Sequence, residues 1–256
     1  MRIIAVDWSG AKAGAQRKIW LAEAAGGILR RLECGRSREE ISQHLVDLAA
    51  RDGELMVGLD FAFSFPAWFL RSEGFSSAHE LWRACAGGAA ERWLSACDPP
   101  FWGRPGRGRP DDVEHFRRTE RETTRVAGIG PKSVFQVGGA GAVGTGSLRG
   151  MPALASLRDA GFAVWPFDSP RLPLVMEIYP RVLTGHVAKS REDARRLHLT
   201  RYRPQLGALF ETAASSQDAF DAATSAIVMS QHARSFASLA GARDEVERLE
   251  GAIWSP

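Results

Sequence analysis

Three acidic residues in this sequence stand directly after short apolar runs. Asp7 follows residues 3–6, Asp60 follows residues 56–59, and Glu177 follows residues 174–176. A carboxylate at the end of a buried strand lies at the rim of a sheet, where open α/β sheets bind their ligands. Because carboxylate oxygens suit hard cations, converging acids of this kind predict a site for Mg²⁺ or Mn²⁺.

A fourth acidic element, Asp218-x-x-Asp221, falls at the start of a strongly apolar segment, residues 217–236, that is expected to be a helix. The i, i+3 spacing places both carboxylates on one helix face, so that both can reach the same ion. Asp221 is followed by residues made for burial, and a buried acid needs a partner.

Each of these acids also has a purely structural explanation. Asp7 and Asp60 can each cap the turn that follows, since Asp favours such local hydrogen bonds. Glu177 can form an ion pair with Arg181. Asp218 can act as the N-cap of its helix. Asp221 is the hardest of the five to explain in this way.

Polar and basic residues in two loops are candidates for contact with nucleic acid: Ser9, Lys12, Arg104, Arg107 and Arg109. The loop after Asp7 offers backbone N–H groups and a lysine, which suit a phosphate. The arginines alternate with glycines beside Phe101 and Trp102, as in flexible nucleic-acid contacts. Both stretches can equally be solvated surface loops. The glycine-rich run 138–146 lacks the order of a P-loop.

Composition sets broad limits on the class of protein. The chain has 256 residues, 45% of them hydrophobic and 25% charged, and a net charge of +3, which permits nucleic-acid binding without requiring it. Three cysteines without CxxC spacing argue against a disulfide framework or a zinc site. No apolar run reaches the ~20 residues of a membrane span, and the N-terminus does not resemble a signal peptide. We therefore expect a cytoplasmic protein without membrane contact.

Hydrophobic periodicity predicts the order of elements. Strands are expected over residues 2–6, 18–24, 27–34 and 54–59, with a helix over 38–50 that opens with the capping box Ser37/Glu40. The rest of the chain is expected to contain an insertion over about 66–146, which includes a helix over 78–97. After it we expect a helix over 148–160, strands over 162–167 and 172–178, and helices near 181–188, 191–197, 203–213, 217–236 and 243–249.

Three strands, a helix and a further strand, with acids after the first and fourth strands, is the order of the ribonuclease H-like fold. We expect one such α/β domain over residues 1–256, whose mixed sheet has three antiparallel strands followed by parallel ones and is flanked by helices. Nucleases of this fold add one or two acids from a C-terminal helix. Such carboxylates clamp two Mg²⁺ ions ~4 Å apart, one of which activates water while the other stabilises the leaving oxygen.

Four short motifs resemble the uncharacterised domain-of-unknown-function 429 family of predicted nucleases with a ribonuclease H fold. They are VDWSG at 6–10, GLDFAFSFP at 58–66, EIYP at 177–180 and DAFDAA at 218–223. The resemblance implies that Asp7, Asp60, Glu177 and Asp221 are the catalytic metal ligands, with Asp218 close behind. Ribonuclease H itself has its second acid on the first helix, so Asp60 fits the Holliday-junction-resolvase branch better. Glu177 has no secure counterpart in either.

These observations favour a metal-dependent nuclease or phosphodiesterase that acts on DNA or RNA with Mg²⁺ or Mn²⁺. One alternative is an actin- or sugar-kinase-like phosphotransferase, although such enzymes usually need two copies of the fold. The other is a non-catalytic nucleic-acid-binding module that uses the arginine-rich loop.

Overall fold

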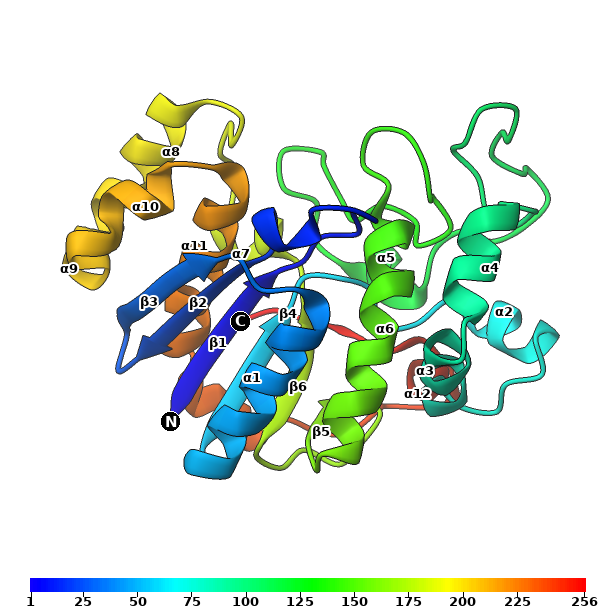
Figure 1. The fold of residues 1–256 in the computed structure, drawn as a ribbon, viewed down its shortest axis with the longest axis horizontal. Helices are drawn as coiled ribbons and strands as arrows, with labels where there is room; N and C mark the ends of the chain where they lie inside the picture. The colour runs from blue at the N-terminus through cyan, green and yellow to red at the C-terminus, as the bar shows by residue number, and fades with distance from the viewer.

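The computed structural model describes all residues, 1–256, and is built around one seven-stranded mixed sheet (Figure 1). The strands lie in the order β3-β2-β1-β4-β6-β5, with β7 also paired to β6. Their bounds are β1 Arg2–Asp7, β2 Trp20–Ala25, β3 Ile28–Cys34, β4 Leu55–Leu59, β5 Ala163–Trp165, β6 Leu174–Ile178 and β7 Ile253–Trp254. β1, β2 and β3 are antiparallel neighbours, whereas β1, β4 and β6 are parallel. The predicted mixed α/β architecture is therefore confirmed.

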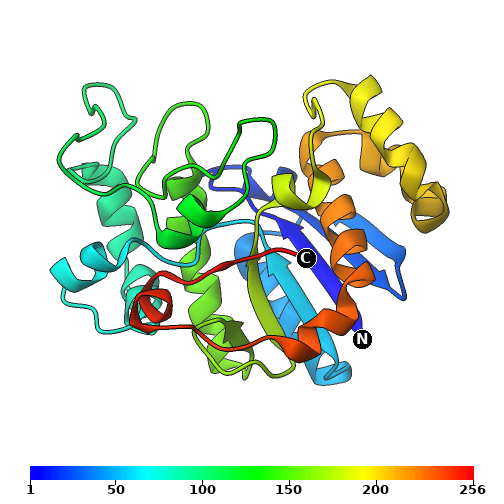
Figure 2. The same ribbon diagram turned by 180° about the vertical axis from the view of Figure 1, so that it is seen from behind.

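Helices cover both faces of the sheet. The longer ones are α1 Arg38–Arg51 and α6 Val143–Asp159, which lie on one face, and α11 Gln217–Gln231, which lies on the other (Figures 1 and 2). The shorter ones are α2 Ala67–Ser72, α3 Ala78–Ala86, α4 Ala89–Ala96, α5 Arg118–Glu122, α7 Pro180–Thr184, α8 Glu192–Leu199, α9 Arg203–Leu206, α10 Phe210–Ala214 and α12 Glu245–Glu250. None of the helices combines the length and the apolar character needed to cross a membrane.

Side chains of each parallel strand alternate between two apolar cores. Along β1, Ile4 and Val6 enter the core beneath α1 and α6, while Ile3 and Ala5 enter the core beneath α11. Burial on both faces explains why these strands read as continuous apolar runs rather than as alternating patterns. Because β1, β4 and β6 are parallel, their carboxyl ends meet at one edge of the sheet, as the sequence predicted.

Several helix boundaries differ from the sequence expectation. The helix expected over 78–97 is interrupted at Gly87-Gly88, because Gly88 adopts φ 98°, a left-handed conformation that a continuous helix does not permit. Helix α6 begins inside the glycine-rich run, at Val143, five residues earlier than expected. Helix α11 ends at Gln231 rather than at residue 236. The capping box at the start of α1 is confirmed, with both reciprocal hydrogen bonds present.

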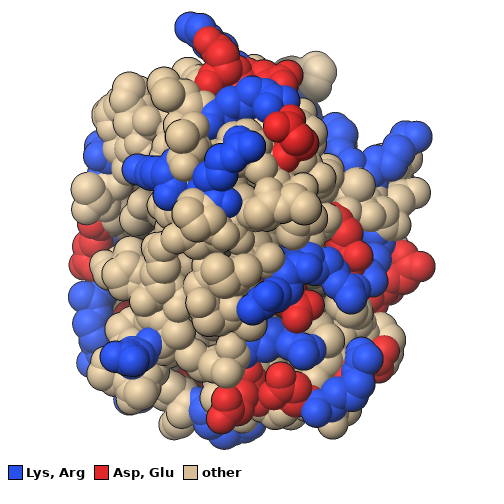
Figure 3. All heavy atoms as spheres, turned by 90° about the vertical axis from the view of Figure 1, so that its left-hand side faces the viewer, with Lys and Arg blue, Asp and Glu red and all other residues tan.

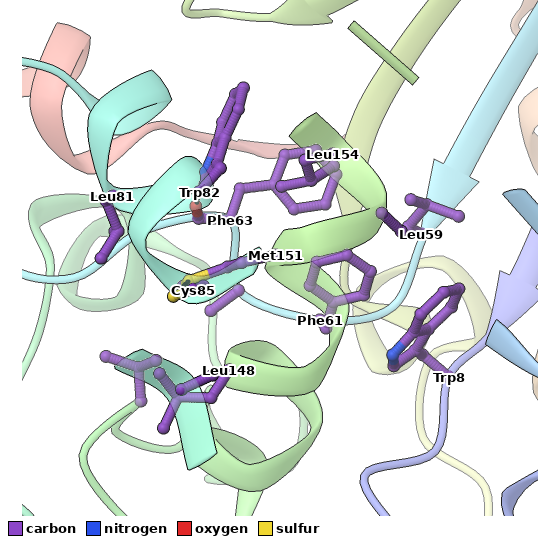
Figure 4. Packing of buried hydrophobic residues seen from close by; sticks show 14 of the residues in the cluster. Trp8, Leu59, Phe61, Phe63, Leu81, Trp82, Cys85, Leu148, Met151 and Leu154 are labelled. Atoms are coloured by element: carbon purple, nitrogen blue, oxygen red, sulfur yellow. Dashed lines mark hydrogen bonds between the residues drawn. The ribbon is translucent and has the colours of Figure 1, made fainter. Parts of the chain in front are cut away.

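The segment 66–142 packs against α6 and shares one apolar core with the sheet. Figure 4 shows Trp82 of α3 and Met151 of α6 in this core, together with Trp8 and Phe61 from the strand ends. The glycines of α6 permit this close packing: a Cβ on Gly150 would lie 2.7 Å from the ring of Phe61. A hydrophobic core that extends across the segment fixes the loops above the strand ends relative to the sheet.

Candidate functional site

Asp7 and Asp60 are neighbours across the parallel pair β1 and β4. Val6 is in register with Leu59, and the Asp60 N–H donates to the Val6 carbonyl over 3.0 Å. Each aspartate comes one residue after that pair, and successive side chains of a strand point to opposite faces. Val6 and Leu59 face α1 and α6, so Asp7 and Asp60 face α11. The structure therefore brings the first two predicted acids together.

Asp221 comes to the same place from α11, which packs across β1 and β2. Burial, reinforced by the charges of Asp60 and Asp221, raises the pKa of Asp7 well above its ordinary value. Burial and the charge of Asp221 likewise raise the pKa of Asp60 to about 8. The pKa of Asp221 is raised by burial as well. The charge of Asp221 thus raises the pKa of both Asp7 and Asp60, and carboxylates close enough to act on one another in this way attract a cation.

Asp218 stands one turn before Asp221 on the same helix face, at the edge of this group. The N-cap of α11 is Ser216, whose hydroxyl accepts from the Ala219 N–H, so the alternative that Asp218 caps the helix is wrong. Partial burial raises the pKa of Asp218, against the opposing charge of Lys18. Its charge also adds to the repulsion at Asp7, Asp60 and Asp221.

A buried lysine that the sequence did not single out lies among these acids. Lys189, between α7 and α8, is only 8% exposed, and its Nζ lies 2.6 Å from Oδ1 of Asp221. That oxygen is buried and receives no well-aligned hydrogen bond. The lysine charge lowers the pKa of Asp7, Asp60 and Asp221, and so offsets part of the effect of burial.

The structure pairs Glu177 with Arg117, which favours a structural role over the metal-ligand role expected from the sequence, although its charge still raises the pKa of Asp60 and it lines the same cleft as Asp60. It is in register with Leu59 rather than with Asp60, and this offset of one residue turns its side chain to the opposite face of the sheet. There Arg117 donates to both carboxylate oxygens, over 2.5 Å and 2.8 Å, and the Phe63 N–H donates over 2.9 Å. The partner of Glu177 is therefore Arg117 and not Arg181, and its geometry is that of a structural ion pair.

The Glu177–Arg117 pair belongs to a fully buried network at the strand ends. Arg117 also donates to Glu120 over 3.0 Å and to the carbonyl of Glu250 over 3.0 Å. The Glu250 side chain in turn accepts from the backbone N–H groups of Ala67 and Arg118. This network fastens α2, α5 and α12 to β6, so its role is to hold the segment 66–142 in place.

A cleft of about 300 Å³ opens between the strand ends and the loops of the segment 66–142. Asp60, Glu177 and Tyr179 line it from the strand ends, Arg117 and Glu120 from the start of α5, and residues 141–143 and 146 from the start of α6. Asp7, Asp221 and Lys189 are not part of its lining, so the acidic group adjoins the cleft through Asp60.

The loop after β1 is held by arginines from two helices. The carbonyl of Ser9 accepts from Arg38 of α1, and that of Gly10 accepts from Arg149 of α6. The Ser9 hydroxyl accepts from the Ala11 N–H within its own turn, while Lys12 is exposed. The structure therefore gives Ser9 a local role, and contact of Lys12 with a phosphate stays a prediction.

The arginine-rich loop is exposed, but each guanidinium has a contact within the chain. Arg104 donates to the Ser95 carbonyl over 3.3 Å, and Arg107 lies 3.1 Å from Asp98. Arg109 lies over the ring of Trp102. Because Trp102 and Phe101 are both buried, neither ring is free to stack on a base. Any nucleic-acid contact of this loop would therefore be electrostatic.

Two further residues near the acids, Tyr179 and Arg181, lie within three residues of the end of β6. The pKa of Tyr179 is raised by burial and by the charges of Asp60 and Asp221, and Arg181 lowers the pKa of both Tyr179 and Asp221. Their position after a strand end was a usable signal, since the EIYP motif includes Tyr179. Lys189 carried no such signal, because it lies in an unremarkable loop.

The chain is thus a mixed α/β protein with three carboxylates and a buried lysine at the carboxyl ends of its parallel strands. No protein family, curated protein or solved structure that was compared with the chain matches it. As the side chains stand, no three acidic, His or Cys residues form a ready coordination shell for a metal ion.

Proposed function

We propose that this chain is a metal-dependent phosphodiesterase that acts on nucleic acid, built on a ribonuclease H-like fold. The order of its strands and the antiparallel-then-parallel sheet are compatible with that fold. Fold alone does not determine activity. The observation that carries the proposal is the convergence of Asp7, Asp60 and Asp221 from β1, β4 and α11.

Three carboxylates in one mostly buried place are costly unless a cation balances them. Lys189 supplies one positive charge, which leaves an excess of negative charge when all three acids are ionised. The donors are hard oxygens, which suit Mg²⁺ or Mn²⁺ better than zinc or copper. The buried Oδ1 of Asp221 has the ammonium of Lys189 as its one close partner, so this oxygen already attracts a cation in the metal-free protein.

In the proposed activity, Asp7, Asp60 and Asp221 would hold the metal, and Asp218 in the first turn of α11 would add negative charge beside it. A bound divalent ion supplies an activated water and stabilises the leaving oxygen. The adjoining cleft receives the scissile phosphate beside Asp60. The Glu177–Arg117 pair keeps the wall of that cleft rigid, which maintains the position of the substrate relative to the acids.

Isothermal titration of Mn²⁺ into the wild type and into the Asp7→Asn/Asp221→Asn double variant tests the proposal. The wild type is expected to bind and the double variant to lose binding, because charge is removed while shape is kept. Asp111→Asn/Asp112→Asn is a matched control, since both residues are exposed and lie far along the chain from the acids. It is expected to bind as the wild type does.

Cleavage assays on single- and double-stranded DNA and RNA then follow with the same proteins. Activity that needs Mn²⁺ and disappears in the double variant would support the proposal. Nucleic-acid binding that persists without metal and without the acids would contradict it and would favour a non-catalytic binding module.

A further inference from the structure

Lys189 occupies the place at which a cation is most strongly attracted. Its Nζ lies 2.6 Å from Asp221 Oδ1, and its charge acts on Asp7 and Asp60 as well. Lys189 is 8% exposed, whereas a surface lysine that merely happened to meet an aspartate would keep its head group in water. The ammonium group therefore neutralises part of the acidic group in the protein as it stands.

A buried arginine fixes the backbone that carries this lysine. Arg195 of α8, 5% exposed, donates to the Lys189 carbonyl over 2.6 Å and to the Ala214 carbonyl over 2.9 Å. Ala214 ends α10, two residues before the N-cap of α11, the helix that carries Asp221. Arg195 thus connects the loop before α8 to the end of α10, and in this way holds Lys189 next to Asp221.

An ammonium group and a divalent ion cannot both take the same carboxylate oxygen at contact distance. We propose that Lys189 is a resident counter-cation of the acidic group, and that a divalent ion binds only when Lys189 leaves Asp221. This inference rests on the proposed metal-dependent function. It makes Lys189 a positioning residue that sets the metal affinity and keeps Asp221 ordered in the metal-free protein.

Mn²⁺ titrations of the wild type, Lys189→Met and Lys132→Met test the exchange. Removing the competing charge is expected to tighten Mn²⁺ binding by about tenfold in Lys189→Met, within the range of typical coupling between ligands. Lys132→Met is the matched control, because Lys132 is exposed, lines the cleft and contacts none of the acids. It removes the same charge from the same region and is expected to leave the affinity nearly unchanged.

The outcomes separate this inference from the proposed function. Binding in the wild type that is equal or weaker in Lys189→Met overturns the exchange but leaves the metal site intact. Binding found only in Lys189→Met supports the exchange. No binding in any of the three proteins overturns both the exchange and the metal-dependent function.

Metal-free stability tests the counter-cation role independently and covers the case in which Lys189→Met folds poorly. In EDTA at pH 8, Lys189→Met is expected to lower the Tm, since it leaves the acids without their nearest positive charge. Adding Asp221→Asn to the same chain is expected to recover most of that loss. An unchanged Tm in Lys189→Met, or no recovery in the double variant, would overturn the role.

Discussion

At the scale of single residues, one step of register separates two kinds of acid at the same sheet edge. Asp7 and Asp60 emerge towards α11 and meet Asp221, whereas Glu177 emerges towards α6 and meets Arg117. The three aspartates share the single nearby charge of Lys189, whereas Glu177 is fully paired with Arg117. Stability measurements and metal titrations should therefore separate them.

Asp60→Asn is expected to stabilise the metal-free protein, and more so at pH 8.5 than at pH 5. The pKa of Asp60 is raised to about 8, so between pH ~4 and ~8 the native state binds more protons than the unfolded state. Wild-type stability therefore falls as pH rises through this window, and the asparagine removes that loss. Each unit of pKa shift corresponds to about 1.4 kcal/mol, and each kcal/mol to about 2–4 °C in Tm.

Thermal unfolding in EDTA at the two pH values measures the effect of Asp60→Asn. The exposed Asp111→Asn serves as the control and should show the same small difference at both. An equal gain for Asp60→Asn at pH 5 and at pH 8.5 would contradict the burial of a charged group at this position.

Glu177→Gln, in contrast to Asp60→Asn, is expected to destabilise the protein. Removing one charge of a buried pair leaves Arg117 incompletely neutralised, which costs about 3 kcal/mol. Because Glu177 lies on the other face, Mn²⁺ affinity should not change. Urea unfolding and Mn²⁺ titration of this one variant check both statements, and a loss of Mn²⁺ binding in a stably folded variant would return Glu177 to the group of metal ligands.

At the scale of elements, the loop that follows Asp7 and β1 approaches the start of α6 closely. A Cβ added to Gly10 would lie 2.4 Å from the backbone nitrogen of Gly146, and backbone cannot rotate away. Gly10→Ala is therefore expected to destabilise the protein by about 1–3 kcal/mol, the usual cost of overpacking. Gly108→Ala is the matched control, since nothing lies within 4 Å of its Cβ position. Chemical denaturation measures the stability of both variants. Equal stabilities would show that the contact between Gly10 and Gly146 leaves room for a methyl group.

The order of the first six strands along the chain, and the position of Asp7 and Asp60 at neighbouring strand ends, could be predicted because both follow from local patterns. Short continuous apolar runs mark strands that are buried on both faces, and parallel pairing makes their ends coincide. The face on which Glu177 emerges depends on the register of β6 against β4, a tertiary property that no local pattern encodes. Lys189 was missed for a related reason, since it reaches Asp221 only through the fold and the support of Arg195.

At the scale of the whole molecule, the net charge is small, and on the face that carries β3 and α8 to α10 charge is interleaved rather than gathered into a basic surface. Figure 3 shows the side that carries β3 and α8 to α10, where blue and red side chains alternate around a broad uncharged area. Ion pairs such as Arg196 with Glu192 and Glu211 account for part of this pattern. With a net charge of only +3, nucleic-acid binding would depend on local groups of arginines near the strand ends.

The arginine-rich loop is the best local group for that purpose. Its backbone touches the glycine-rich run before α6, since a Cβ on Gly103 would lie 2.3 Å from the Gly138 carbonyl oxygen. The weak contacts of its arginines within the chain are inexpensive to break at an exposed surface. We therefore expect that replacing Arg104, Arg107 and Arg109 by Gln leaves the stability of the protein unchanged. It should make the plot of log association constant for nucleic acid against log salt concentration less steep, by about 2–3 in slope.

Salt titration of binding to a labelled oligonucleotide, followed by fluorescence anisotropy, measures that slope. The matched control replaces three exposed arginines outside this loop, one in β3, one in α3 and one after α11: Arg30, Arg83 and Arg234. Both triple variants lose the same total charge, so a general effect of net charge would lower the slope equally in the two. A loss confined to the loop variant would show that the phosphate backbone contacts this loop. Equal losses would mean that the loop has no special part in nucleic-acid binding.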